Sequence, residues 1–297
     1  MNATDASFVV KRRSMLGFQT RQQLIMNLVL AVTAIVVVFP IFWTISSSFK
    51  TIQEIYSLVP RLLPKRLDFS NYRFLFETSV IDYKQAILNS LVVSALAVIL
   101  VVTCATLAGY GFSRVDFRHR DRIFNMIVLL QFVPLTAGII AQWHIMSLLR
   151  LKDTLWGLAL LLTAMALPAN IFLMRQVFLG IPRDLEDAAR IDGASTSQML
   201  WYVMLPLAGG GIILTAVNSF LFVWGDFIYA RTMISIPSKY TLPVIITTSI
   251  PSTPATLRVA TYGVYNAAAM ITALPAIIFF ILIQNRFYEG AREGLKG

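Results

Sequence analysis

The stretch LEDAARIDGASTSQMLWYVMLPL, residues 185–207, decides how this chain is organised. It begins with a charged segment that contains Glu186, Asp187 and Asp192, although mostly apolar runs precede and follow it. Gly193 separates this charged segment from an uncharged one that contains a Leu-Pro pair near its end. A polar helix–glycine–helix unit between two apolar segments of membrane length indicates a surface unit held between two membrane spans.

The composition is that of a membrane protein. Of the 297 residues, 57% are hydrophobic and 13% are charged, and the mean hydropathy is +0.70. A soluble domain carries roughly 25% charged residues. The net charge of +10 fits basic residues at the cytoplasmic edges of membrane helices, and no basic–aromatic nucleic-acid module accompanies it. We therefore expect a polytopic membrane protein that contacts lipid and binds no nucleic acid.

Six segments contain no Asp, Glu, Lys or Arg over a length that can cross a bilayer, which takes about 20 apolar residues. Because a chain inside lipid must satisfy its own backbone hydrogen bonds, these segments predict helices. The predicted fold class is all-α, a polytopic membrane protein with six transmembrane helices, and the even number places both termini on one side. The segments are Leu24–Trp43, Ala86–Phe112, Ile123–Leu149, Leu155–Met174, Leu207–Gly225 and Thr261–Asn285.

Four of these segments contain a proline: Pro40, Pro134, Pro168 and Pro275. Each proline removes a backbone donor and can kink its helix, so it is either a hinge for a gate or one of the prolines that membrane helices commonly hold.

The short loop 113–122 sets the orientation, because basic residues in short loops favour the cytoplasmic side. It carries Arg114, Arg118, Arg120 and Arg122. We therefore expect both termini in the cytoplasm. The expected organisation is a cytoplasmic N-terminal arm at 1–21, a six-span transmembrane domain at 22–286 with a polar loop at 181–206 between spans 4 and 5, and a cytoplasmic tail at 287–297.

The loop between the fourth and fifth spans is expected to form two short, rigidly capped helices. Asp184 is positioned as the N-cap of the first, with Asp187 three residues later. Gly193 should end this helix, because glycine adopts the left-handed conformation without penalty. Ser195 and Gln198 form a capping box that opens the second helix. Such a unit suits the transmission of force to a partner that grips it; the alternative interpretation is an ordinary loop with good caps.

The sequence carries no motif of a catalytic or metal site. It lacks G-x-x-x-x-G-K-[ST], H-E-x-x-H and G-x-S-x-G, so it has no phosphate-binding loop of its own. His119 and His144 are too isolated to form a metal site, and a single cysteine, Cys104, permits no internal disulfide. We expect a non-catalytic chain without a metal or cofactor of its own.

The string D-A-A-x-x-D-G-A, followed after a spacer by L-P, resembles the signature loop of binding-protein-dependent ABC importer permeases. The family pattern is Glu-Ala-Ala, three residues, Gly, about nine residues, then hydrophobic-x-Leu-Pro. Asp187 is one methylene shorter than the usual Glu, and Glu186 beside it offers a substitute. The matching positions here are Asp187, Ala188, Ala189, Gly193, Val203, Leu205 and Pro206.

Three further stretches are similar to carbohydrate-uptake members of this family, and together the resemblance covers the chain from the first span to Gly297. They are NSLVVS at 89–94, SFLFVWGDFIYA at 219–230, with Gly225 where Asn is common, and RFYEGAREGLKG at 286–297. The last resembles the end of the maltose-type second permease subunit, whose tail reaches towards the ATPase; here it includes Gly294, Lys296 and Gly297.

The resemblance implies a multi-pass subunit of the bacterial cytoplasmic (inner) membrane. Its partners would be a sister permease, two ATP-binding subunits and an extracytoplasmic sugar-binding protein, with ATP and Mg bound by the partner ATPase. Loop 181–206 would then contain the coupling helix. The residues implied in ATPase coupling are Glu186, Asp187, Ala188, Ala189, Asp192, Gly193, Ala194, Leu205 and Pro206.

A possible substrate path lies near the end of the fifth span. Trp224, Asp226 and Tyr229 offer an aromatic face and an acceptor, which suit the C–H face and the hydroxyls of a sugar. Asn218, two helical turns earlier, can line the same route. The alternative is that Asp226 caps or pairs locally. An ion-coupled secondary transporter is the competing function, and it would normally require buried carboxylates or broken helices near mid-membrane.

Overall fold

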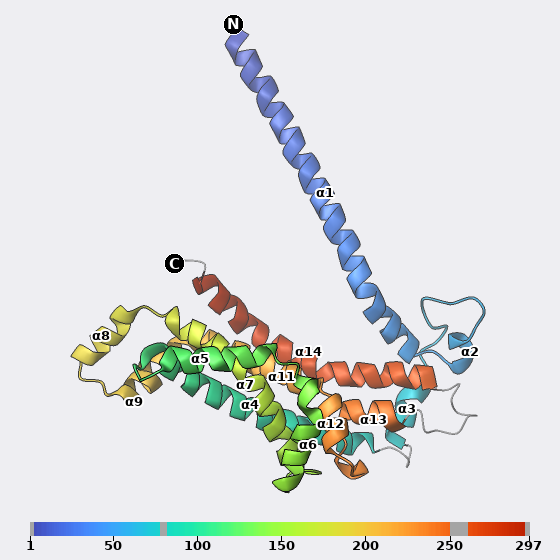
Figure 1. Ribbon diagram of the computed structural model, residues 1–297. Helices are drawn as coiled ribbons and strands as arrows, with labels where there is room; N and C mark the ends of the chain where they lie inside the picture. Colours follow the sequence, from blue (N-terminus) through green and yellow to red (C-terminus); the bar gives the residue numbers. More distant parts are fainter. Residues whose placement is uncertain (1–2, 78–81, 250–260, 295–297) are drawn as a thin grey trace. The chain divides into compact units, whose positions relative to one another are not determined.

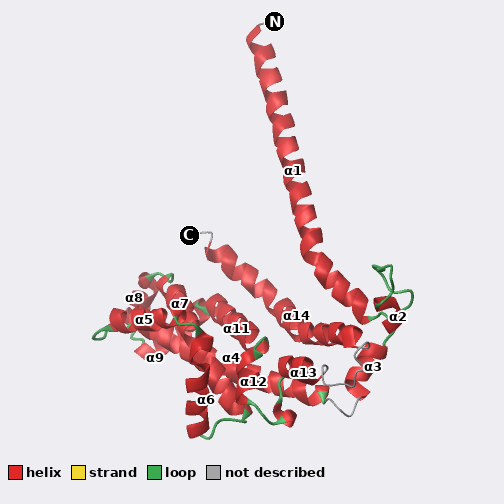
Figure 2. Cartoon of the chain, turned by 45° about the vertical axis from the view of Figure 1, so that its right-hand side comes forward, coloured by secondary structure: helices red, strands yellow, loops and turns green. Residues whose placement is uncertain are grey.

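The structure, a computed structural model, describes residues 3–77, 82–249 and 261–294. Within these ranges every regular element is helical, as Figure 2 shows, so the all-α prediction is confirmed for them. The chain divides into two compact units, the first made of Met1–Tyr72 and Tyr262–Met270, the second of Arg73–Thr261 and Ile271–Gly297. The last helix, α14 (Thr261–Gly294), contributes to both units.

The first unit is dominated by α1 (Ala3–Ser48), one helix that runs through both the expected arm and the expected first span. Within this unit, the most apolar window of its stretch Gln23–Ser48 is 0% buried. A helix that is apolar all round must be covered by lipid or by another protein. Pro40 lies inside the helix without ending it, and the Thr44 hydroxyl donates to the Pro40 carbonyl at 2.9 Å.

Buried polar side chains tie the segment after α1 to the end of that helix. Asn71 Nδ2 donates to the carbonyls of Ser48 and Lys50, at 2.9 and 3.0 Å. The Lys50 ammonium donates to the Arg61 carbonyl at 2.7 Å and lies 4.2 Å from the centre of the Trp43 ring. The short helices in this part of the chain are α2 (Ile52–Ile55) and α3 (Ser70–Glu77).

The second unit is built on α4 (Tyr83–Arg114), α7 (Leu155–Leu179) and α11 (Gly209–Trp224), which pack against one another (Figure 1). The most extensive contact is between α4 and α7. The shorter helices of this unit are α5 (Arg120–Leu129), η1 (Leu130–Phe132), η2 (Leu135–Gly138), α6 (Ile139–Leu148), α8 (Arg183–Ile191), α9 (Thr196–Gln198), η3 (Met199–Met204), α10 (Leu205–Leu207), α12 (Ile228–Met233), η4 (Pro237–Lys239) and α13 (Leu242–Ser249).

Four helices are long and apolar enough to cross a membrane: Gln23–Ser48, Tyr83–Arg114, Leu155–Leu179 and Tyr262–Gln284. They correspond to four of the six expected spans. The other two are bent pairs of helices, Arg120–Phe132 with Thr136–Leu148 at 84° and Thr196–Leu207 with Gly209–Trp224 at 74°. The count of six spans therefore stays a prediction.

The span expected at Ile123–Leu149 is kinked, as Pro134 allows, and the span expected at Leu207–Gly225 begins with a bend at Ala208. Both breaks have local causes. The first break includes Pro134, which has no N–H to donate to a helix. The second follows Pro206 and falls at Ala208, directly before three glycines, which have low helix propensity.

Both ends of the second unit are held by polar side chains. At one end, called here the asparagine end, Asn89 Nδ2 donates to the carbonyls of Ser238 and Tyr240, both at 2.9 Å, and Asp153 Oδ1 accepts from the Ser235 amide. At the other, called here the arginine end, α4 ends at Arg114, α5 begins and α7 ends. The helices α4 and α7 both run from the asparagine end to the arginine end.

Glycines permit the close packing of α7 against its two neighbours. A Cβ placed on Gly109 of α4 would lie 2.6 Å from the Met174 Cβ and 2.9 Å from the Arg175 amide nitrogen. A Cβ on Gly211 of α11 would lie 2.5 Å from the Val177 side chain. In contrast, a Cβ on Gly111 would meet nothing within 4 Å.

These distances predict opposite effects of one substitution at two positions of α4. Gly109→Ala should destabilise the protein by about 1–3 kcal/mol, since the methyl group overpacks the contact with the α7 backbone. Gly111→Ala should be neutral or stabilising by up to about 1 kcal/mol, because alanine has the higher helix propensity. Thermal unfolding of the two purified variants in the same detergent measures the difference. Equal midpoints would contradict the packing described here.

Candidate functional site

The loop after α7 forms a helix that is closed by a left-handed glycine. Helix α8 ends with Asp192 as its C-cap, and Gly193 has φ 83°. The Gly193 amide donates to the Arg190 carbonyl and the Ala194 amide to the Ala189 carbonyl, both at 3.0 Å. This is the Schellman pattern, which satisfies the last carbonyls of a helix. The expected end of the helix at Gly193 is confirmed.

The expected start of this helix was placed too late. The N-cap is Pro182 and α8 begins at Arg183, so Asp184 lies inside the first turn. The cap makes no side-chain hydrogen bond. Proline has its φ preset near the helical value, and that favours an early start. Asp184 and Glu186 in the first turn still place negative charge where the helix dipole favours it.

The second segment of the loop begins with the expected capping box. The Ser195 hydroxyl accepts from the Gln198 amide at 3.3 Å, and the Gln198 side chain accepts from the Ser195 amide at 2.8 Å. The helix then widens into the π-helical turn η3, from which Met199 and Met204 are buried in the core at the arginine end. The second segment is therefore anchored by its own apolar side chains.

Glu186 is held inside the protein. Its Oε1 lies 2.8 Å from Nε of Arg114, at the end of α4, and the two side chains are 5% and 3% exposed. Nη2 of Arg114 donates to the carbonyl of Phe178 at 2.5 Å and to that of Ile181. Arg190, 63% exposed, approaches the other oxygen of Glu186 at 3.8 Å. Removing one partner of a buried pair leaves an uncompensated charge, which costs about 3–5 kcal/mol.

The remaining loop residues divide between surface and core. Asp187, Ala188, Asp192, Gly193 and Pro206 are exposed, whereas Ala189, Ala194 and Leu205 are half-buried. Glu186 is therefore not available at the surface as a substitute for Asp187. Large apolar side chains are also exposed on this loop, a feature typical of surfaces that bind another protein. They are Leu185, Ile191, Trp201 and Tyr202, with Ile191 at 86% and Tyr202 at 78%.

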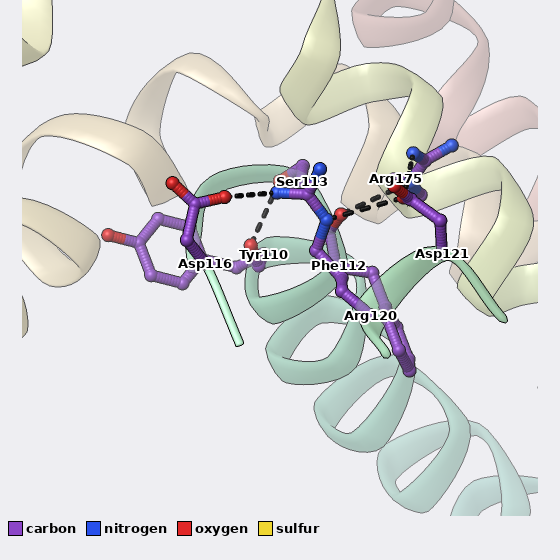
Figure 3. A network of polar contacts seen from close by, with 7 residues as sticks. All are labelled: Tyr110, Phe112, Ser113, Asp116, Arg120, Asp121 and Arg175. Carbon is purple, nitrogen blue, oxygen red and sulfur yellow. Dashed lines mark hydrogen bonds and ion pairs between the residues drawn. The ribbon is translucent and has the colours of Figure 1, made fainter. Parts of the chain in front are cut away.

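A second arginine connects α7 with α4 and α5 at the same end, and Figure 3 shows its surroundings. Nε of Arg175 donates to the Phe112 carbonyl at 3.2 Å, and Nη2 lies 3.4 Å from Oδ1 of Asp121. Its guanidinium lies 4.2 Å from the centre of the Phe124 ring. Arg120 continues the network, since its Nε lies 3.3 Å from Oδ1 of Asp121.

A cavity of about 620 Å³ lies between α7, α11 and the broken pair of helices around Pro134. Asn218 Nδ2 donates to Oδ1 of Asn170 at 3.2 Å within its wall, and Asn170 Nδ2 donates to the Ala166 carbonyl at 2.8 Å. The other lining residues are Leu130, Gln131, Val133, Gly138, Gln142, Leu161, Ala164, Met165, Pro168, Ala169 and Phe222. This wall is mostly apolar and carries amides but no carboxylate.

Three residues expected on the substrate path lie apart from this cavity. Trp224 and Tyr229 are buried, and Trp224 Nε1 donates to the Thr272 carbonyl at 3.0 Å. Asp226 accepts from the amides of Tyr229 at 3.4 Å and Ala230 at 2.8 Å, so the local capping interpretation describes its contacts. Burial raises the pKa of the Asp226 carboxyl, whereas the hydrogen bonds from these two backbone amides act to lower it. A role of these three in transport stays a prediction.

Only part of the predicted C-terminal tail, 287–297, lies within the described residues. Gly294 is the last described residue, at the end of α14, and Lys296 and Gly297 lie outside the described residues. In the described part of the chain, no group of three or more His, Cys, Asp and Glu side chains could hold a metal ion.

Arg114 and Asn170 are the residues whose roles were missed. Arg114 was identified only as one of several basic residues in a short loop. Its position directly after a long apolar span, and the position of Glu186 three residues before the half-buried Ala189, were the available signals. Asn170 was hidden because a lone amide in an apolar helix has no sequence pattern; its partner is 48 residues away.

Residues 14–290 match the family of binding-protein-dependent transport system inner membrane components, and the chain belongs to this family. The galactooligosaccharides transport system permease protein GanQ of Bacillus subtilis (strain 168) is 31% identical, over 90% of this chain and 93% of its own length. The maltodextrin transport system permease protein MdxG of the same strain is 29% identical, over the same shares of the two chains. The resemblance drawn from the loop is thereby confirmed.

A solved structure shares the fold. One chain of a bacterial ABC transporter involved in the import of the acidic polysaccharide alginate superposes with a TM-score of 0.78 over 97% of this chain and 99% of its own length. The sequence identity is 22%, so this likeness describes the fold.

Proposed function

We propose that this chain is the transmembrane permease subunit of an ATP-driven, binding-protein-dependent importer, and that it forms half of the translocation path for an oligosaccharide or related carbohydrate. The observation that carries the proposal is the capped loop 181–206, in a chain whose residues 14–290 match a family of transport-system membrane components. GanQ and MdxG are named for galactooligosaccharides and maltodextrin, which supports a carbohydrate as the substrate.

Loop 181–206 would dock on a separate ATPase subunit, which binds the ATP and Mg, so that this chain is itself non-catalytic. The exposed residues of α8 and the stiff cap at Gly193 support this role, because a docked element must transmit force without bending. The arginine end would then face the cytoplasm together with both termini. The tail that contains Gly294, Lys296 and Gly297 would contact the same ATPase.

The other expected partners are a sister permease, a second ATPase subunit and an extracytoplasmic solute-binding protein. The exposed apolar surface of Gln23–Ser48 supports a sister subunit or lipid around α1. Six spans, counting each bent pair once, would complete the transmembrane domain. Asn218 in the wall of the cavity supports a substrate path there, since hydroxyl-rich ligands need donors and acceptors on an apolar wall.

An ion-coupled secondary transporter has less support. The broken helices around Pro134 are a feature that such transporters share. However, the cavity beside them is lined by amides and no carboxylate, so the wall offers no proton-binding group. The buried carboxylate of Glu186 lies at the arginine end and is already paired with Arg114.

Reconstitution tests the function directly. In vesicles that hold this chain, a sister permease and two ATPase subunits, with the binding protein outside, labelled oligosaccharide should enter only when ATP and Mg are present on the ATPase side. Vesicles without the ATPase subunits are the control and should show no uptake. Uptake driven by a proton or sodium gradient in the absence of ATP would contradict the proposal.

Gly193 should be essential for coupling because of its backbone conformation. A side chain there meets nothing within 4 Å, so a substitution acts only through φ 83°. Gly193→Val should strain or loosen the helix end by about 1–2 kcal/mol and lower the sugar transported per ATP hydrolysed, or release the ATPase. Gly193→Asn is the matched control, because asparagine tolerates this conformation, and it should retain most of the coupling. Equal transport by both variants would contradict the role of the cap.

Asn218 should affect the handling of sugar rather than ATP hydrolysis. Asn218→Leu removes an amide from the cavity wall and leaves Oδ1 of Asn170 without this partner. The loss of about 1–3 kcal/mol in hydrogen bonding should raise the sugar concentration for half-maximal uptake roughly 5- to 150-fold. Asn218→Ser retains a polar group and should show a smaller rise. Unchanged uptake kinetics in Asn218→Leu would exclude this wall from the path.

A further inference from the structure

Glu186 differs from the rest of α8 in being buried and ion-paired with a membrane helix. Its first neighbours, Leu185 and Asp187, are exposed. We propose that Glu186 is the positioning residue through which the motion of α8 enters the membrane helices, and that Arg114 is the link that receives it. This inference rests on the coupling function proposed above and assigns the route of that coupling.

One guanidinium joins three elements. Arg114 belongs to the last turn of α4 and forms an ion pair with Glu186 of α8, with Nε 2.8 Å from Oε1. With Nη2 it holds the carbonyl of Phe178, in the last turn of α7, and that of Ile181 just beyond it. Because the guanidinium is a rigid planar fork, a displacement of Glu186 moves the ends of α4 and α7 together.

Arg175 makes the reverse connection. It belongs to α7 and donates to the Phe112 carbonyl in the last turn of α4, so each of the two helices donates an arginine to the end of the other. It also reaches Asp121 and the Phe124 ring of α5, the helix that begins the bent pair around Pro134. A displacement of Arg114 is therefore transmitted to α4, α7 and α5 at the arginine end. Two of them, α7 and α5 with η1, continue to the wall of the cavity.

The covalent route from α8 to α11 is less suited to carry force. It passes through the π-helical turn η3 and a 74° bend at Ala208, where the helix restarts in three glycines. A Cβ on Gly209 would meet nothing within 4 Å, so no side-chain packing holds the chain at this glycine. The route through the buried ion pair of Glu186 with Arg114 is more direct than this covalent route. It therefore provides the stiffer path from α8 into the helix bundle.

The test compares two Glu→Gln substitutions in the reconstituted importer. Glu186→Gln removes the buried charge, and Glu77→Gln removes an exposed charge in α3, outside loop 181–206. The readouts are the ATPase recovered with the complex, the rate of ATP hydrolysis and the sugar transported per ATP. We expect Glu186→Gln to retain ATPase and hydrolysis while transport per ATP falls about tenfold or more. Glu77→Gln should change transport per ATP less than twofold. Glu186→Asp, which keeps the carboxylate, should lie between the two.

A second variant keeps the test decisive if Glu186→Gln fails to fold. Replacement of both partners, Arg114→Met with Glu186→Met, leaves no unpaired buried charge and should restore folding and assembly. Low transport per ATP in this assembled double variant supports the route, whereas wild-type coupling in it, or in Glu186→Gln, overturns it. Absence of ATP-dependent uptake by the unaltered complex would instead overturn the proposed function, so the two failures are distinguishable.

Discussion

The last carbonyls of a helix have no backbone partners, and at the arginine end the last turns of α4 and α7 lie close together. Arg114 supplies donors to the end of α7, and Arg175 supplies a donor to the end of α4. A buried guanidinium is costly unless a carboxylate compensates it. Glu186 compensates Arg114 and Asp121 approaches Arg175, so the packing of the two central helices depends on acidic residues of two other elements.

This dependence explains why α8 is fixed to the bundle although most of its surface is exposed. Its buried face presents Glu186 to Arg114, and Ala189 packs against the core at the arginine end. The following segment adds Met199 and Met204, which are 3% and 0% exposed. The loop is therefore stiff where it meets α4 and α7, and the helix after Ser195 bends where the chain continues into α11.

Much of the fold follows from apolar length and from local caps. Four spans, the glycine that closes α8 and the capping box at Ser195 are dictated by neighbouring residues, so a sequence pattern predicts them. A kink at Pro134 also follows from the sequence, but the size of that bend and the bend at Ala208 do not, because an apolar run does not show where it changes direction. The pairs of Arg114 with Glu186 and of Asn170 with Asn218 join residues 72 and 48 positions apart, so only the packing of the helices brings them together.

The cavity and the arginine end place opposite demands on polar side chains. A link that transmits force must be strong and enclosed, and charged groups paired at the arginine end meet that demand. A path for a solute must bind weakly enough to release it, and amides on a mostly apolar wall meet that demand because each neutral hydrogen bond contributes only about 1 kcal/mol net. Asn170 is 1% exposed and held by the Ala166 carbonyl, so it presents its oxygen to Asn218 in a fixed orientation. Helix α7 carries Asn170 near its middle and Arg175 nearer its end, whereas Asn218 belongs to α11. A shift of the end of α7 relative to α11 would therefore also change the cavity wall at this amide pair.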